Sequence, residues 1–340
     1  MRAPGPAPRS SLFLVVGAVA SVVLWTARDH LTFTLGLLGV LIAPLLHGRH
    51  RLTGRRFGLD LLPPLLAIAA AIGHGIAPLS APLAITALLV VGAAFPAHLW
   101  LEALRPRIAS SEFLLLLLAQ PGLALAVHIL DPQTVTLDLA TRMQLATWFV
   151  ATAMLQTGLG LVRTDPMRAL IAIGQSQAAL LIAGALVSEH GFTAEYLMLA
   201  GTDLGLATVV LALADLRARH RIGRLQPDNG MADLEPTSAR LFLVAGWFFV
   251  GLPGGIVFFA EDLLFHALVR HSNAMTAAMI LAQVLNAIGF YRVYLGVYAG
   301  RPRAGSVTNG AMPRWLAPAL TTLILITVGL GLWPQLLLGH

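Results

Sequence analysis

Cysteine is absent from all 340 residues of the chain, and charged side chains make up only 11% of it. The absence of cysteine excludes structural disulfides, thiolate-bound iron–sulfur clusters, zinc sites with Cys ligands and covalently attached c-type haem in this chain. A redox centre would therefore have to be held by histidines or by a partner protein. The charged fraction is well below the roughly 25% that is typical of soluble domains, so the composition points away from a soluble protein.

Hydrophobic residues take the place of the missing charges. They form 57% of the chain, and the mean hydropathy is +0.79. We therefore expect an all-α polytopic membrane protein with about 12 transmembrane segments, each near the roughly 20 residues that a bilayer core requires. The net charge of +6 does not indicate nucleic-acid binding, because the basic residues lie in short loops between apolar runs.

The sequence shows no arrangement typical of an enzyme. It contains no nucleophile–base pattern, phosphate-binding loop or zinc motif. We therefore predict no intrinsic catalytic residue, no cofactor and no metal site in this chain. The chain remains compatible with a role as one subunit of a redox-driven, proton-pumping complex.

Residues 251–271 form the stretch with the strongest functional signal. Helix-breaking residues, with Pro253 and Gly254 at their centre, are followed by an apolar helix that carries Glu261, Asp262 and His266. An ionisable side chain inside a membrane helix costs about 2.5 to 3.5 kcal/mol on insertion scales, so it normally faces the bundle interior or a wet cavity. A helix break is tolerated only where protein or trapped water satisfies the freed backbone groups. Together these features predict an ion-handling site.

A second helix break is predicted at Gln120-Pro121-Gly122, because proline removes a backbone donor inside an apolar run. Gln120 is a polar group beside that break. Two more polar side chains lie inside predicted membrane segments, Gln177 and Asp203. Such side chains serve either an ion path or hydrogen bonds between helices, and the residues alone leave both uses open.

Asp262 and His266 are four residues apart and therefore share one face of the predicted helix. They are a possible pair, either as part of the ion path or as a local packing contact.

The orientation in the membrane is not fixed by the arginines. Counting the predicted segments puts the clusters at 49–56 and 217–224 on one side, and Arg301 and Arg303 on the other, which conflicts with the positive-inside rule.

Four stretches in the right order resemble motifs of one family, the antiporter-like subunits of respiratory complex I, Mrp antiporters and membrane-bound hydrogenases. The stretch at 251–264 resembles the motif on the second broken helix of that family. Residues 95–103 are similar to its Pro-x-His-x-Trp-Leu-x-x-Ala motif. The other two stretches are Thr164-Asp165-Pro166-Met167-Arg168 followed by Ser176-Gln177, and residues 286–298.

The resemblance implies an inverted repeat with one broken helix in each half, and Glu261 then matches the family's ionisable residue on the second broken helix. It divides the chain into N-terminal helices with a basic loop, two antiporter-like halves and a C-terminal helix, at residues 1–57, 58–187, 188–300 and 301–340. The chain departs from the family where lysines are usual, with Gln120 and Met167 in their places. We therefore expect a shortened, divergent member.

Three functions follow from the resemblance. The first is a proton- or cation-translocating membrane subunit of a complex-I-like energy-converting assembly, with Glu261 as the proton carrier. The second is the membrane subunit of a two-component inorganic carbon (CO2 or bicarbonate) uptake system, and the third is a non-conducting scaffold subunit. In each case the expected surroundings are other membrane subunits, a soluble partner protein, and the lipid of a bacterial-type inner membrane that the chain crosses several times. Protons or monovalent cations are the expected ligands.

Overall fold

The computed structural model describes residues 8–27, 29–48, 57–76, 80–99, 120–130, 137–187, 193–220, 222–226, 229–301 and 312–333. Every regular element in these ranges is a helix, and they contain 13 helices. By length and composition, 4 of the described helices can cross a membrane: Leu139–Val162, Pro166–Val187, Glu195–His220 and Asn273–Tyr298. The all-α fold class is thus established, whereas the number of spans stays a prediction.

The chain divides into two compact units, Met1–Phe149 and Val150–His340. The first unit holds α1 (Pro8–Thr26), α2 (His30–Gly48), α3 (Phe57–Ile76), α4 (Ala81–Val91), α7 (Gln120–Leu130) and the first part of α8 (Leu139–Val162). The predicted boundaries at 57, 187 and 300 stay predictions.

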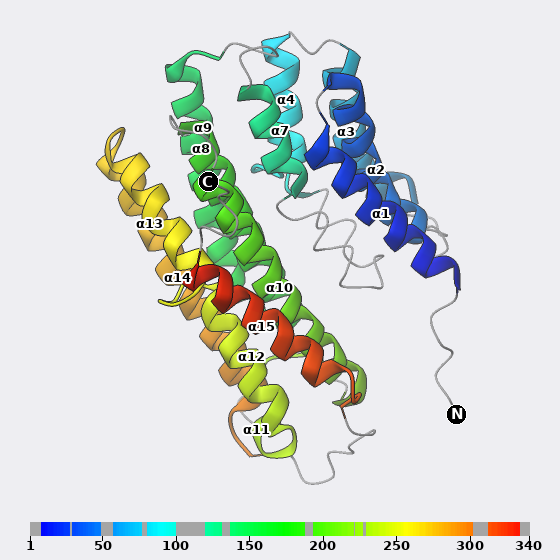
Figure 1. Ribbon diagram of the computed structural model, residues 1–340, viewed down its shortest axis with the longest axis vertical. Coiled ribbons are helices and arrows are strands. Elements are labelled where there is room, and N and C mark those ends of the chain that lie inside the picture. The colour runs from blue at the N-terminus through cyan, green and yellow to red at the C-terminus, as the bar shows by residue number, and fades with distance from the viewer. Residues whose placement is uncertain are drawn as a thin grey trace. The chain divides into compact units, whose positions relative to one another are not determined.

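Within the first unit, α1 and α2 form an antiparallel hairpin (Figure 1). A Cβ atom added at Gly39 would lie 2.6 Å from the Cβ of Ala20, and one at Gly36 would lie 2.6 Å from the backbone N of Leu24. The two backbones therefore approach closely through small residues, as membrane helices commonly do.

The second unit is built around α9, which is buried on all sides. This unit contains the rest of α8, then α9 (Pro166–Val187), α10 (Thr193–His220), α11 (Met231–Leu234), α12 (Pro236–Phe249), α13 (Ile256–Val269), α14 (Asn273–Tyr298) and α15 (Leu316–Leu332). Every residue of α9 from Ala169 to Val187 is buried, which identifies it as the core helix. Both α10 and α14 pack against it.

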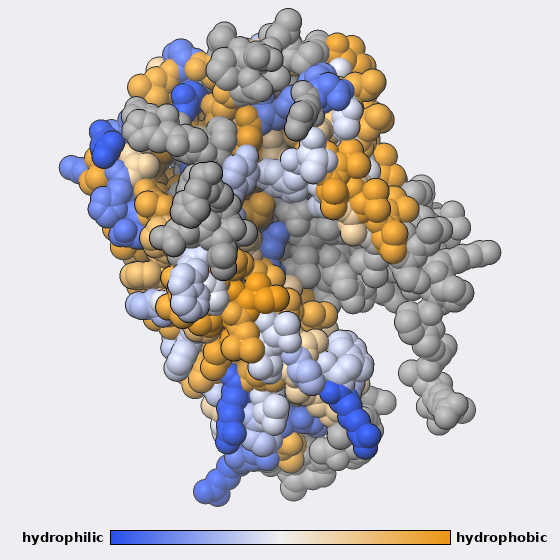
Figure 2. Space-filling model, viewed as in Figure 1, coloured by the Kyte–Doolittle hydropathy of each residue, from blue (hydrophilic) through white to orange (hydrophobic). Residues whose placement is uncertain are grey.

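The outer surface of the second unit is largely apolar along the helices and polar towards their ends. In the view of Figure 2, hydrophobic side chains lie along the helices, and hydrophilic ones gather around the end that carries α11 and around the end of α13. On α14 alone, the exposed apolar residues are Ile280, Leu281, Val284, Ile288 and Leu295. A surface of this kind suits contact with lipid or with another membrane protein.

Helix α15 lies across α10 and α12 and also contacts α13 (Figure 1). Near its end, Gly331 sits against the segment that joins α12 to α13. A Cβ at Gly331 would lie 2.7 Å from the carbonyl O of Gly254 and 2.6 Å from the carbonyl C of Gly255. Only a glycine allows this approach without a shift of backbone, so α15 is fitted directly onto the interruption between the two helices.

Candidate ion-handling site

Glycines with left-handed backbone form the interruption between α12 and α13. Gly251 has a φ of +79° and Gly254 a φ of +97°, values that side-chain-bearing residues rarely adopt. The N–H of Leu252 donates to the carbonyl of Trp247 at 2.9 Å, and the N–H of Gly251 donates to that of Phe248 at 3.4 Å. This pair of bonds around a left-handed glycine is a Schellman motif, which ends α12 and satisfies two of its last carbonyls.

Glu261 lies in the second turn of α13, and its side chain points back to this interruption. The residue is 6% exposed, and its Oε1 has no hydrogen-bond partner among the residues that the structure describes. A Cβ at Gly251 would lie 2.3 Å from Glu261 Oε2. The carboxyl group therefore packs against bare backbone, in a space that exists only because residue 251 is glycine.

A cavity of about 260 Å³ opens beside Glu261, between α13 and α14. Most of its wall is apolar, including Phe258, Phe265 and Val284, while Gln283 is a polar group on the α14 side. This volume is far more than a single water molecule requires. The buried carboxyl group thus faces a partly open pocket on the outer side of α13 and α14, in which water or a small cation fits.

Hydrogen-bonded amides continue from the cavity into the core. Gln283 on α14 and Gln177 on α9 form a reciprocal pair, with each side-chain N–H donating to the other's oxygen at 3.0 Å. One turn further, Asn286 donates to Ser176 at 3.0 Å and accepts from Thr157 on α8 at 2.8 Å. Amides and hydroxyls order water well, but they carry no charge at neutral pH. The chain has no lysine at all, so no lysine supplies a positive charge here.

The other predicted site residues are arranged differently. Asp262 and His266 pair loosely on α13, with His266 Nδ1 3.6 Å from Asp262 Oδ1, and their side chains are 60% and 74% exposed. Asp203 is half-buried in α10. The first unit holds Gln120, Pro121 and Gly122, at the start of α7. The side chain of Gln120 and the residues just before it lie outside the described part of the chain.

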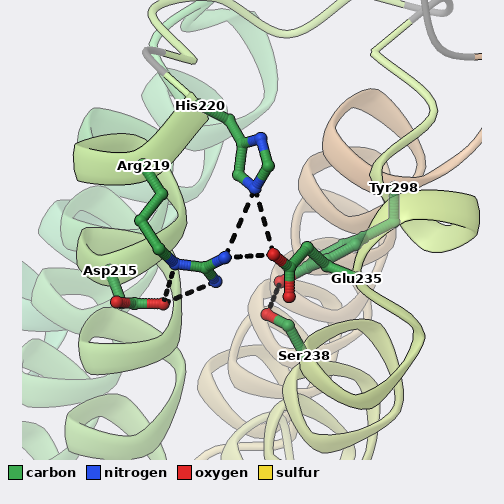
Figure 3. Close-up of polar contacts among 6 residues, drawn as sticks. All are labelled: Asp215, Arg219, His220, Glu235, Ser238 and Tyr298. Atoms are coloured by element: carbon green, nitrogen blue, oxygen red, sulfur yellow. Dashed lines mark hydrogen bonds and ion pairs between the residues drawn. The ribbon is translucent and has the colours of Figure 1, made fainter. Parts of the chain in front are cut away.

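A cluster of charged residues joins α10 to the start of α12 (Figure 3). Arg219 donates to Asp215 Oδ2 through Nε at 2.9 Å and through Nη2 at 2.7 Å, and its Nη1 donates to Glu235. His220 Nε2 lies 3.2 Å from the same Glu235 oxygen. Nearby, the hydroxyls of Ser238 and Tyr298 are hydrogen-bonded at 2.9 Å, which ties α12 to α14.

Two opposing effects act on Glu235, which lies outside the apolar spans. Partial burial raises the pKa of this carboxyl group, whereas the hydrogen bonds and charges of Arg219 and His220 lower it. The second effect is the larger, so the pKa lies below the usual value of 4.5. The cluster thus holds Glu235 ionised at neutral pH and serves to lock the ends of three helices together.

The structure corrects the predicted placement of Arg301 relative to the arginines at 217–224. The N–H of Gln226 donates to the carbonyl of Gly296 at 3.1 Å, and that of Gly230 to Ala299 at 2.9 Å. The end of α14 and the segment after α10 therefore lie at the same end of this unit. The conflict arose because the segments at 240–251 and 251–271 were counted as two spans, although α12 and α13 have only 14 residues each.

Two residues near the site escaped the sequence analysis. Gln283 carries no pattern that separates it from other polar residues on a long helix. Glu195 lies in the first turn of α10, where a carboxylate is common, yet it is 1% exposed. Its place at the start of the apolar run that follows was the one available signal. Among the described residues, no three His, Asp or Glu side chains are grouped so that they can hold a metal ion.

Comparison with known proteins gives one family and a set of similar folds. The family model described as NADH:quinone oxidoreductase/Mrp antiporter, TM, matches residues 66–288. A chain in the Mrp complex from Dietzia sp. DQ12-45-1b matches with a TM-score of 0.76 and 18% identity, over 96% of this chain and 75% of that one. A chain of the membrane-bound sulfane sulfur reductase (MBS), an archaeal respiratory membrane complex, matches with a TM-score of 0.82 and 17% identity.

That second match covers 96% of this chain and 60% of the MBS chain, so this chain spans less than two thirds of its length. At such identities the structural likeness establishes the fold alone. No curated protein sequence matches the chain.

Proposed function

This chain belongs to the NADH:quinone oxidoreductase/Mrp antiporter transmembrane family, and on that premise we propose that it translocates protons or cations as a membrane subunit of a complex-I-like energy-converting assembly. Glu261 is the carrier in this proposal. The observation that supports it is the buried carboxyl group, which lies against Gly251 in the interruption and faces a cavity of about 260 Å³.

The physical argument starts from the environment of that carboxyl group. Burying an ionised carboxylate without a compensating charge is costly, and Glu261 Oε1 has no hydrogen-bond partner among the described residues. A proton or cation that enters the cavity relieves this cost when it binds. A membrane potential then supplies about 2.3 kcal/mol per charge for each 100 mV, which favours release on one side of the membrane.

The direction of the protein in the membrane follows from the arginines of the second unit. Because the end of α14 lies beside the segment after α10, Arg301 joins Arg217, Arg219 and Arg224 at one end. We assign this end to the cytoplasm by the positive-inside rule. Neighbouring membrane subunits and a soluble partner belong to the proposal too, supported by the multisubunit complexes to which the two matched chains belong, with a bacterial-type inner membrane as the location.

The test is proton flux in proteoliposomes that contain the purified chain with the subunits that co-purify, at an imposed potential. We expect Glu261→Gln to reduce flux to the background leak, because glutamine matches the size of glutamate but binds no proton. Asp233→Asn is the control. It removes an exposed carboxylate on α11 that does not line the cavity, and should leave the flux intact.

Equal flux in wild type and Glu261→Gln, with both proteins folded, would refute Glu261 as the carrier. Flux no greater than the background leak in both proteins would favour the scaffold alternative, in which the amides of the core only hold helices together. Bicarbonate-dependent uptake without proton flux would instead favour the inorganic carbon system, for which no observation in the structure speaks directly.

A further inference from the structure

Glu195 is the second carboxyl group buried in the second unit, and the path described above does not use it. The residue is 1% exposed, and Oε2 has no hydrogen-bond partner among the described residues. It lies at the start of α10, a helix that packs against both α9 and α13. This is the end of the unit opposite to the cluster around Arg219, which lies at the other end of the same helix.

A structural role alone does not account for this burial. A carboxylate in the first turn of a helix gains about 0.3 to 1 kcal/mol from the helix dipole when it is exposed. Removing an ionised carboxylate from water carries an effective penalty of several kcal/mol. The dipole is therefore too weak to offset the burial, and an exposed position at the same turn would give the helix the same benefit.

The surroundings of Glu195 connect it to α13. A Cβ at Gly184 on α9 would lie 3.5 Å from Glu195 Oε1 and 2.5 Å from Leu264 Cδ2, so both side chains approach the same point. Leu264 follows Glu261 by three residues, which is roughly 4.5 Å along the helix axis. Glu195 and Leu264 therefore both border Gly184, and Leu264 lies one turn of α13 from Glu261.

We propose that Glu195 is a second proton-binding site, through which protons pass between the N-terminal end of α10 and Glu261. This inference rests on the proposed function. In each passage the carboxylate accepts a proton from water at one side, which forms an O–H bond and a neutral acid, and then returns it to water at the other. Charge and protons balance at each step, and neither an oxidant nor a reductant is needed.

Flux and chemical labelling together test this proposal in the complex as it is purified. Glu195→Gln should lower proton flux per folded protein about tenfold or more, as expected when a group that transfers protons is removed, and Glu195→Asp should restore part of it. An apolar carbodiimide, which reacts with protonated carboxylic acids, should label Glu195 in the wild type. A carboxylate that serves only the helix dipole would stay ionised and would not be labelled.

The outcomes separate the two proposals. If Glu261→Gln abolishes flux while Glu195→Gln leaves it unchanged, Glu195 is not on the path and only this inference falls. If Glu261→Gln itself has no effect, the proposed function fails first. If Glu195→Gln does not fold, the wild type and Glu195→Asp decide. The inference is overturned if wild-type Glu195 is not labelled, whatever the flux of Glu195→Asp. It is supported if wild-type Glu195 is labelled and Glu195→Asp retains flux.

Discussion

Replacing Gly251 by alanine tests the packing of Glu261 directly. Two separate penalties act at this position. The left-handed backbone, with φ of +79°, costs a residue with a side chain about 1 to 3 kcal/mol. The new methyl group also lies 2.3 Å from Glu261 Oε2, and overpacking of this kind costs a further 1 to 3 kcal/mol or so.

Gly254 provides the matched control. Its φ is +97°, so Gly254→Ala carries the same kind of backbone penalty. The nearest atom to its added Cβ, however, is Phe248 Cε1 at 3.8 Å, an ordinary contact. We therefore expect Gly254→Ala to lose about 1 to 3 kcal/mol of stability with flux per folded molecule retained, and Gly251→Ala to lose more and to reduce flux as well.

A double-mutant cycle isolates the steric part. In a Glu261→Ala background the carboxyl group is gone, so Gly251→Ala should cost about 1 to 3 kcal/mol less than in the wild type. The cost of Gly254→Ala should be the same in both backgrounds. Unfolding of the purified protein in detergent measures all the variants. An equal cost of Gly251→Ala with and without Glu261 would refute the placement of the carboxyl group against Gly251.

Two more predictions concern the charged end of the second unit. Because the pKa of Glu235 is lowered in the folded state, the stability that it contributes is present above its usual value of 4.5 and is lost as the pH falls through the lower, folded value. Thermal unfolding should therefore show Glu235→Gln to be less stable than the wild type at pH 7, with a difference that shrinks as the pH falls below about 4.5, and a constant difference would contradict this. Because the chain has no cysteine, a single cysteine can be introduced and labelled unambiguously. In Gly223→Cys, at an exposed position with no atom near its Cβ, a membrane-impermeant thiol reagent should react only from the cytoplasmic side, and in Arg270→Cys only from the opposite side. The reverse pattern would argue against the assigned orientation.

The interruption between α12 and α13 could be argued from the sequence alone, and so could the choice of Glu261 as a candidate residue. Glycines beside a proline leave few regular conformations open, and a carboxylate in an apolar helix is costly wherever the helix lies. Both arguments are local, so they need no knowledge of neighbouring helices. The all-α class followed in the same way, from the length and hydrophobicity of the apolar runs.

The surroundings of those residues depend on contacts between distant segments. Glu195 looks like an ordinary first-turn carboxylate until Gly184 and Leu264 are placed beside it. The pairing of Gln177 with Gln283 joins residues 106 positions apart, and no pattern along either helix specifies it. The orientation conflict had a similar origin, because the hydrogen bonds from Gln226 to Gly296 and from Gly230 to Ala299 reveal which helix ends lie together.

Through the contact of Gly331 with Gly254 and Gly255, α15 supports the interruption between α12 and α13 from outside. The short helices α12 and α13 are connected by six residues, 250–255, of which Gly251 and Leu252 are tied back to α12 by hydrogen bonds. The backbone of α15 at Gly331 packs directly against the segment that joins α12 to α13, and this packing restricts the angle between the two helices. The pocket beside Glu261 thus borders an interruption that is held from outside by a helix that contributes no residue to the lining of the pocket.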